Sequence, residues 1–237
     1  MPIAAERGRL RDRLRLAKYR FLRYLPGDTG IRYTSRYRRG TGATARLFAR
    51  ALQGAAGSTC IDLGANVGDI TLTMAEHGAR VFAFEPDPWS AAAWRTRTAG
   101  LNGVELVEAA AGVTDATVRI YRHRGFGADP ATASLSTSTW AEHGDVDGAS
   151  GFAVRQIDFP AWLRALDTDV HILKIDIEGG EVPLLESLLD DSRLAARIGF
   201  VFAEMHGWIV PSLADRILAL RRRTRPMRHP VIDLDWA

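Results

Sequence analysis

The chain has 237 residues, of which 46% are hydrophobic and 25% are charged, and its net charge is +3. This is the composition of a globular protein with one substantial core. No run of about 18 apolar residues is present, and Met1 to Arg15 is too charged for a signal peptide, so we expect a soluble cytoplasmic protein without a transmembrane segment. The one cysteine, Cys60, excludes an intrachain disulfide framework or a zinc–cysteine cluster.

The small net charge hides an asymmetry along the chain. Residues 1–50 contain 14 basic and 3 acidic residues, whereas the remainder contains 17 basic and 25 acidic residues. We therefore expect a basic N-terminal helical extension over residues 1–50 and a main domain over residues 51–237.

The extension carries an amphipathic pattern. Leu10, Leu14, Ala17 and Phe21 are spaced by three or four residues, which predicts a helix within residues 9–25. Such a helix packs on the body or in a homo-oligomer, lies on an anionic surface such as a membrane or a nucleic acid, or is partly disordered. The sequence leaves these alternatives open.

From Ser58 onward, short apolar runs alternate with helix-like stretches, the pattern of strand–helix–strand units that form a parallel sheet. The first half of this region predicts strands at 59–63, 81–84 and 104–108, and helices at 69–77 and 88–99.

Beyond residue 110 the pattern changes. Residues 117–121 alternate as a strand does, and 125–151 is rich in Gly, Ala, Ser and Thr without a helical period, which predicts a substrate-side insertion or loop. The remaining predicted strands are 152–157, 170–175, 198–203 and 231–234, and the remaining predicted helices are 160–166, 181–189 and 213–223.

The most informative segment, Ile61 to Asp69, stands between a predicted strand and a predicted helix. Gly64 and Gly68 permit a tight turn or a close approach of the backbone to a ligand, and Asp62 at the strand end can face a positively charged ligand group. A dinucleotide loop would need three glycines in a G-x-G-x-x-G pattern to seat a pyrophosphate. The segment therefore favours a ligand that lacks a pyrophosphate and carries a cation.

Three further strand ends carry acidic side chains. Glu85, at the end of the second strand, is placed to accept hydrogen bonds from the two hydroxyls of a ribose, although Glu85 and Asp87 could instead cap the next helix. Asp176 and Glu178 follow the strand 170–175, where Lys174 and Asp176 share a face and could pair. Alternatively, Asp176 is a helix N-cap and Glu181 a first-turn acid. Glu204 and His206 follow the next strand.

In order and spacing, these segments resemble the FkbM family of methyltransferases over residues 58–207. Asp62 to Leu72 resembles the family's cofactor loop and Phe84 to Pro88 its ribose-binding turn. Ile172 to Glu181 resembles its Leu-Lys-Ile-Asp-Val-Glu-Gly-Ala-Glu segment, with Ile177 and Gly180 as departures. Glu204 to His206 resembles its late Glu-x-His.

The resemblance implies a Rossmann-like class I methyltransferase fold, a mostly parallel twisted α/β sheet with helices on both faces. It also implies S-adenosylmethionine as the methyl donor and a hydroxyl oxygen of a sugar, small molecule or secondary metabolite as the acceptor. Proteins of this fold normally finish with a strand hairpin, so a lone strand at 231–234 predicts a sheet that is shortened there or completed by the N-terminal extension. The implied cofactor contacts are Asp62, Gly64, Ala65, Asn66, Gly68, Glu85 and Pro86, and the residues nearest the acceptor are Asp176, Glu178, Glu204 and His206.

Methyl transfer to a hydroxyl needs alignment of donor and acceptor and removal of a proton. His206 is a candidate general base, and Asp176 or Glu204 could orient it or act instead. The same oxygen-rich set, Asp176, Glu178, Glu204 and His206, could hold Mg²⁺ to acidify the hydroxyl. The residue pattern does not decide between these alternatives.

Other functions compete with this hypothesis. An NAD(P)-dependent oxidoreductase shares the fold, but the sequence has neither a three-glycine loop nor a Tyr-x-x-x-Lys pair. A nucleic-acid methyltransferase would use the basic extension and the Arg221 to Arg228 cluster, but the acids after residue 175 would repel phosphates. A non-catalytic binding module is a further alternative.

Overall fold

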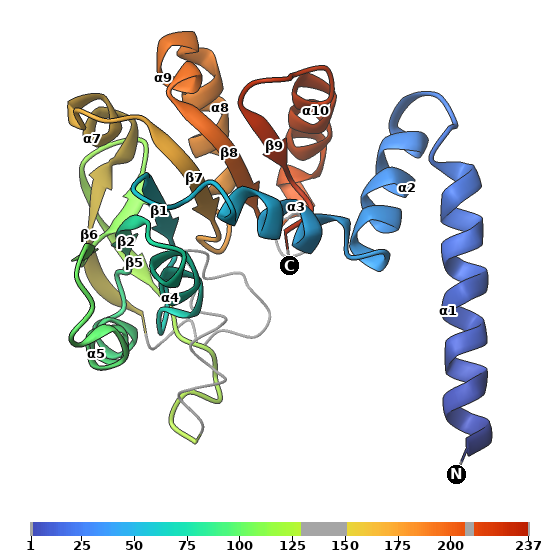
Figure 1. Cartoon of the computed structure of the whole chain (residues 1–237), viewed down its shortest axis with the longest axis horizontal. Coiled ribbons are helices and arrows are strands. Elements are labelled where there is room, and N and C mark those ends of the chain that lie inside the picture. Colours follow the sequence, from blue (N-terminus) through green and yellow to red (C-terminus); the bar gives the residue numbers. More distant parts are fainter. Residues whose placement is uncertain (1, 129–150, 207–210, 237) are drawn as a thin grey trace.

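A computed structural model of the chain describes residues 2–128, 151–206 and 211–236, and within them the side chains of residues 12–128, 151–206 and 212–236. In these ranges the chain forms one larger sheet, one smaller sheet and the helices around them (Figure 1). Most of the predicted insertion at 125–151 lies outside the described residues.

The larger sheet has six parallel strands among the described residues. In spatial order they are β3 (Val104–Val107), β2 (Arg80–Phe84), β1 (Thr59–Leu63), β7 (Val170–Ile175), β8 (Ile198–Ala203) and β9 (Val231–Asp233). Three of them, β1, β7 and β8, have the predicted bounds, because buried parallel strands are near-continuous apolar runs.

Helices cover both faces of this sheet, as predicted for a Rossmann-like α/β fold. Ile61 and Leu173 point into one core cluster, whereas Cys60, Ile172 and Phe202 point into another on the opposite face. On the first face lie α7 (Phe159–Ala165), α8 (Glu181–Asp190), α9 (Ser192–Ala196) and, after the short 3₁₀ helix η2 (Pro211–Leu213), α10 (Ala214–Thr224). On the second face lie α3 (Ala43–Leu52), α4 (Asp69–Glu76) and α5 (Pro88–Thr98).

The strand order reverses between β1 and β7. The chain runs from β1 outward to β3 on one side, and from β7 outward to β9 on the other. Ligands of open α/β sheets bind at such a switch point, outside the carboxyl ends of the strands. The loops after β1 and β7 are therefore the expected walls of a site.

A smaller sheet of three strands was only partly foreseen. It consists of β4 (Ala110–Gly112), β6 (Phe152–Asp158) and β5 (Ala116–Ile120), with β5 antiparallel and β4 parallel to the central β6. The sequence predicted β5 and β6 to within a residue or so. It did not predict β4, because three residues are too few to show the alternation of apolar and polar residues that indicates a strand.

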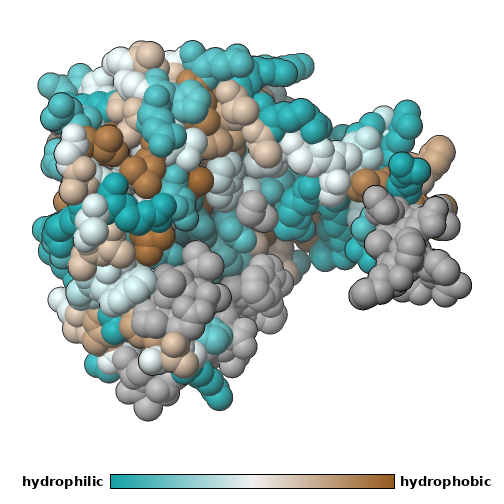
Figure 2. All heavy atoms as spheres, turned by 60° about the horizontal axis from the view of Figure 1, so that its bottom comes forward, coloured by the Kyte–Doolittle hydropathy of each residue, from teal (hydrophilic) through white to brown (hydrophobic). Residues whose placement is uncertain are grey.

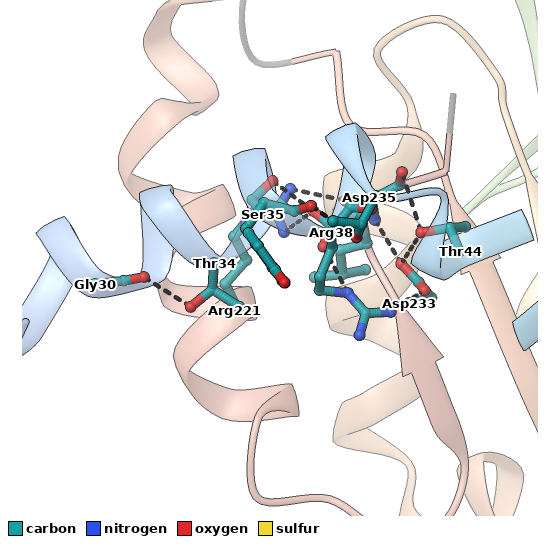
Figure 3. A network of polar contacts seen from close by, with 11 residues as sticks. Gly30, Thr34, Ser35, Arg38, Thr44, Arg221, Asp233 and Asp235 are labelled. Atoms are coloured by element: carbon teal, nitrogen blue, oxygen red, sulfur yellow. Dashed lines mark hydrogen bonds and ion pairs between the residues drawn. The ribbon is translucent and has the colours of Figure 1, made fainter. Parts of the chain in front are cut away.

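The last strand, β9, pairs with β8 in parallel, and helices of the extension cover its end. Arg38 of α2 (Gly27–Gly40) forms ion pairs with Asp233 and Asp235, and Arg221 of α10 binds Asp235 with an N–O distance of 2.7 Å (Figure 3). Ser35 donates to Asp235 over 2.5 Å. The extension thus completes this edge through side chains, and not through an added strand.

The extension itself is helical. α1 (Pro2–Leu22) overlaps the helix predicted within 9–25 and lies against α2, well apart from the sheets (Figure 1). α3 crosses residue 50, the expected end of the extension, and its Phe48 packs in the core on the second face. The helices in the described ranges include none that is long and apolar enough to cross a membrane.

Candidate functional site

A cavity of about 750 Å³ opens at the carboxyl ends of β1, β2, β7 and β8. This volume suits a ligand of cofactor size. Loops of the larger sheet form one wall, and β4, β5 and Gln156 of β6 form another. The segments that the sequence singled out therefore meet in one place.

The loop after β1 is shaped by a close approach of two strand ends. Gly64 has a φ of +74°, and a Cβ there would lie 1.7 Å from the backbone oxygen of Asp176. Gly64, Ala65 and Asn66 line the cavity, and their contact with a cofactor stays a prediction. Gly68, at φ +95°, is the N-cap of α4 beside Trp94 and does not line the cavity formed by the described residues.

Glu85 joins the two predicted cofactor segments. Its Oε2 accepts the N–H of Asn66 and its Oε1 accepts the N–H of Asp87, each over 2.8 Å. Burial raises the pKa of Glu85 to about 7, although these two N–H groups oppose the shift. Glu85 and Pro86 line the cavity, so this carboxylate faces any ligand held there.

Asp87 has a structural role, which the alternative interpretation predicted for it. Its carboxylate caps α5 by accepting the N–H of Trp89 over 2.8 Å. The same carboxylate binds Arg122 through two bonds of 2.7 Å each. The guanidinium of Arg122 also lies over the rings of Phe126 and Phe152. Arg122 thus links the turn after β2 to the segment just before the predicted insertion at 125–151. The sequence analysis did not predict this contact, because no sequence pattern indicates that two residues 35 positions apart will pair.

Asp62 does not face the cavity that the described residues form. Its buried Oδ2 accepts the hydroxyl of Thr71 over 2.7 Å, and its Oδ1 lies 3.3 Å from Nζ of Lys174. A direct contact between Asp62 and a ligand therefore stays a prediction, and the structure gives this carboxylate a protein partner instead.

Lys174 connects the two halves of the site. It lies 3.5 Å from the Asp176 carboxylate, which confirms the predicted pairing, and it donates to the backbone oxygen of Gly64 over 2.8 Å. Burial lowers the pKa of Lys174, but the charges of Asp62 and Asp176 outweigh burial and raise it. The ammonium therefore stays charged between the loops after β1 and β7.

Beyond Lys174, carboxylates surround a buried histidine. Nε2 of His206 lies 3.8 Å from Asp176, 3.5 Å from Glu178 and 3.8 Å from Glu204. The three acids line the cavity, whereas His206 is only 4% exposed and lies behind them. Burial lowers the pKa of His206, but the hydrogen bond and charge of Glu181 and the other acids raise it to about 9.

Two of these acids, Glu178 and Glu204, have pKa values above those of ordinary carboxyl groups. Burial, with the charges of neighbouring acids, raises the pKa of Glu178 to about 8 and also raises that of Glu204. Glu178 has a φ of +51°, a left-handed conformation that is uncommon away from glycine and that is concentrated at functional sites.

Glu181 is the member of this cluster that the sequence did not place in the site. Its Oε1 accepts from Ile177 N–H over 3.0 Å and lies 3.0 Å from Nδ1 of His206. It is a first-turn acid of α8, as the alternative interpretation had it. The N-cap of α8 is Gly180, so the alternative role of Asp176 as an N-cap is wrong.

Several cavity residues gave no sequence signal. Val113, Tyr121 and Gln156 line the cavity on the side of the smaller sheet. Trp236, the last residue that the structure describes, also lines it. The Trp236 ring packs on Phe48 and Phe202 at centroid distances of 4.8 and 5.6 Å. Contacts of this kind follow from tertiary packing and have no local pattern.

Three side chains of the cluster place possible metal-ligating atoms near one another. One donor atom each from Asp176, Glu204 and His206 lies within 4.8 Å of the other two. Two carboxylates and an imidazole form a donor set known from divalent metal sites.

Comparisons with known proteins found one family model and one similar solved structure. The family model of the methyltransferase FkbM domain matches residues 62–225, more than half of the chain. A crystal structure of a methyltransferase FkbM from Methylobacillus flagellatus KT is similar, with a TM-score of 0.41 and 16% sequence identity. That match covers 71% of this chain and 38% of the Methylobacillus chain. The comparison with curated proteins gave no match.

Proposed function

Because the chain belongs to the FkbM family of methyltransferases, we propose that it moves the methyl group of S-adenosylmethionine to a hydroxyl oxygen of a small molecule, sugar or secondary metabolite. One observation carries this proposal: the glycine loop, Glu85 and the carboxylate–histidine cluster line or border one cavity at the switch point of the sheet. A donor and an acceptor can meet there away from water.

The residues present fit the proposed cofactor. Glu85 has oxygen lone pairs left for ribose hydroxyls after it accepts two N–H groups. The small residues Ala109–Gly112 line the same cavity and leave room for an adenine ring. When bound, S-adenosylmethionine supplies an electrophilic methyl group on a sulfonium. The carboxylate of Asp176 lines the cavity and favours a positive charge there.

We assign the proton-accepting role to Glu204 rather than to His206. Glu204 lines the cavity and has a raised pKa, which makes it a stronger base than an ordinary carboxylate. His206 lies behind the acids and keeps its proton up to about pH 9, so near neutral pH it stabilises their charges. Asp176 would orient the hydroxyl, and Glu178, with a pKa of about 8, would donate a hydrogen bond to the acceptor.

A divalent cation, Mg²⁺ among them, is the alternative way to acidify the hydroxyl. Asp176, Glu204 and His206 would hold it, and His206 would have to lose its proton. Assays after chelation and with Mg²⁺ added back distinguish the two proposals: unchanged turnover in chelator supports proton transfer to Glu204, and its loss supports the metal.

The charge of the site favours an uncharged, hydroxyl-rich acceptor. The carboxylates of Asp176 and Glu204 would repel the phosphates of a nucleic acid, whereas sugar hydroxyls can donate to them. The predicted insertion at 125–151 would contribute to acceptor choice. We place the activity in residues 51–237, with 1–50 as an extension, and in the cytoplasm, because the sequence has one cysteine and therefore no intrachain disulfide that would need an oxidising compartment.

Isothermal titration calorimetry of the purified chain with S-adenosylmethionine, and separately with NAD(H), tests the cofactor. We expect binding of the sulfonium ligand, its loss in Glu85→Ala, and its retention in Glu105→Ala, whose carboxylate is exposed on β3. Binding of NAD(H) alone would overturn the proposal in favour of an oxidoreductase. Steeply salt-dependent RNA binding, with transfer to RNA, would favour the nucleic-acid alternative.

A further inference from the structure

Exposed apolar side chains gather on the N-terminal arm, which we define as residues 2–40. The structure describes six exposed large hydrophobic side chains, and four belong to this arm: Leu14, Phe21, Tyr24 and Leu25, with exposed fractions of 63, 76, 75 and 44%. Leu14 and Phe21 are two helical turns apart and share one face of α1, and Tyr24 and Leu25 continue from its end. A grouping of this kind marks an interaction surface.

This apolar stripe is not the face that packs within the arm. The opposite face of α1 contacts α2: a Cβ on Gly40 would meet Leu16, and the Tyr19 ring lies 5.7 Å from that of Tyr33. Arg23 lies over the Tyr37 ring at 4.4 Å. α1 therefore has two apolar faces, one covered by α2 and one exposed.

Basic residues border the exposed stripe. At 100° per residue, Arg13 and Arg20 lie along one edge and Lys18 along the other, and the sequence has no acidic residue between Asp12 and Asp28. Hydrophobic and strongly hydrophilic atoms accordingly lie side by side at the outer end of the arm (Figure 2). α1 as a whole is not strongly amphipathic, because its face toward α2 is apolar as well. Its outward face, with Leu14 and Phe21 between cationic borders, has the chemistry of a surface that lies in the interface of an anionic bilayer.

We propose that the exposed face of α1 binds the surface of an anionic phospholipid bilayer. The apolar side chains Leu14 and Phe21 enter the acyl boundary, and Arg13, Arg20 and Lys18 contact the acidic headgroups. The inference concerns the arm alone and does not depend on the proposed reaction.

Charge argues for this occupant over a second copy of the chain. A symmetric contact between two α1 stripes would bring the same basic borders together, and like charges oppose such a contact. The aliphatic side chains Leu14 and Leu25 likewise have no counterpart in nucleic-acid binding, where phosphates and base faces are the partners.

The arm is also attached firmly enough to hold the body at a bilayer. α2 carries α1 on one side, and on the other side its Arg38 and Ser35 bind the buried carboxylate of Asp235 (Figure 3). Arg222 of α10 forms a further ion pair with Asp28. Binding through α1 would therefore tether the body to the bilayer through α2.

The test is co-sedimentation of the full chain with two kinds of vesicle, pure phosphatidylcholine and phosphatidylcholine with about one quarter phosphatidylglycerol. We expect binding to the anionic vesicles that weakens as salt is added. Phe21→Ala should weaken it about tenfold. Arg13→Gln with Arg20→Gln should weaken it about 30-fold, at about 1 kcal/mol for each charge removed. Leu101→Ala, which removes an exposed leucine outside the arm, is the matched control and should bind as the wild type does.

The inference fails if the chain does not sediment with anionic vesicles, or if Phe21→Ala and the wild type bind them equally. It also fails if light scattering shows a dimer that Phe21→Ala dissociates while vesicles bind neither protein, because the stripe then contacts a second copy. Phe21 is exposed, so the variant should fold; circular dichroism and calorimetry with S-adenosylmethionine check this independently of vesicle binding.

Discussion

Nδ1 of His206 lies 3.0 Å from Oε1 of Glu181, and the two side chains are 4% and 1% exposed. Glu181 also accepts the N–H groups of Ile177 and Gly179, so it is fixed to the turn after β7. The histidine ring therefore has one orientation, in which Nε2 faces the acids that line the cavity. A carboxylate in this position fixes the orientation of the histidine ring and raises its pKa without contacting the substrate.

Replacing Glu181 with Gln should lower the pKa of His206 below its present value of about 9, because the negative charge beside the ring is removed and the remaining hydrogen bond is to a neutral acceptor. We expect turnover to fall about 10- to 100-fold with a smaller change in KM. An NMR titration of the His206 ring protons measures the pKa directly. Glu186→Gln, on the exposed side of α8, is the control, and a pKa still near 9 in Glu181→Gln would contradict this account.

The affinity for S-adenosylmethionine should depend on pH through Glu85. Its pKa is raised to about 7, so below that pH the carboxyl is protonated and loses acceptor capacity for ribose hydroxyls. Affinity should be full above about pH 8 and fall as pH decreases through 7, approaching tenfold per pH unit. Calorimetry from pH 6 to 8 measures this. Glu85→Gln should bind weakly with a flat profile, and an equally flat wild-type profile would exclude Glu85 as the group responsible.

Arg122 should stabilise the fold through Asp87. Arg122→Ala leaves a wholly buried carboxylate with only its helix-capping bonds, at a cost of about 2 kcal/mol in the free energy of unfolding. Arg122→Lys should recover only part of it, because an ammonium cannot make both bonds at once. Denaturant unfolding measures each variant. Arg95→Ala breaks an exposed pair with Glu108 and should cost no more than about 0.5 kcal/mol; equal losses at both sites would refute the assignment.

The sequence predicted the parts of this molecule that depend on local pattern. The apolar runs 170–175 and 198–203 are strands with the predicted ends, and Glu85, Asp176 and Glu204 meet because carboxyl ends of parallel strands share one edge. Lys174 and Asp176 pair because strand residues two apart share a face.

The remaining features depend on contacts between distant segments. Asp62 ends a strand, so the sequence predicts a ligand contact there, and that contact stays a prediction. Its burial against Lys174 and Thr71 is a tertiary feature that has no local pattern. The helices α2 and α3 were not foreseen as separate elements, since their apolar residues face neighbours far along the chain. Trp236 likewise lines the cavity only because its ring packs on Phe48, a residue far away in the sequence.

Gly64 should be far less tolerant of substitution than another glycine with the same backbone conformation. Gly64 and Gly57 have φ values of +74° and +71°, but a Cβ on Gly57 would meet no described atom within 4 Å, whereas one on Gly64 would overlap the backbone oxygen of Asp176. Gly57→Ala should therefore cost about 1 kcal/mol, the penalty of a left-handed conformation alone. Gly64→Ala must also push apart the ends of β1 and β7, so we expect at least about 3 kcal/mol or a failure to fold, together with loss of S-adenosylmethionine binding. Thermal unfolding and calorimetry of both variants measure the difference. Similar stability in the two would mean that the strand ends move apart readily and that the cavity is not built on their close approach.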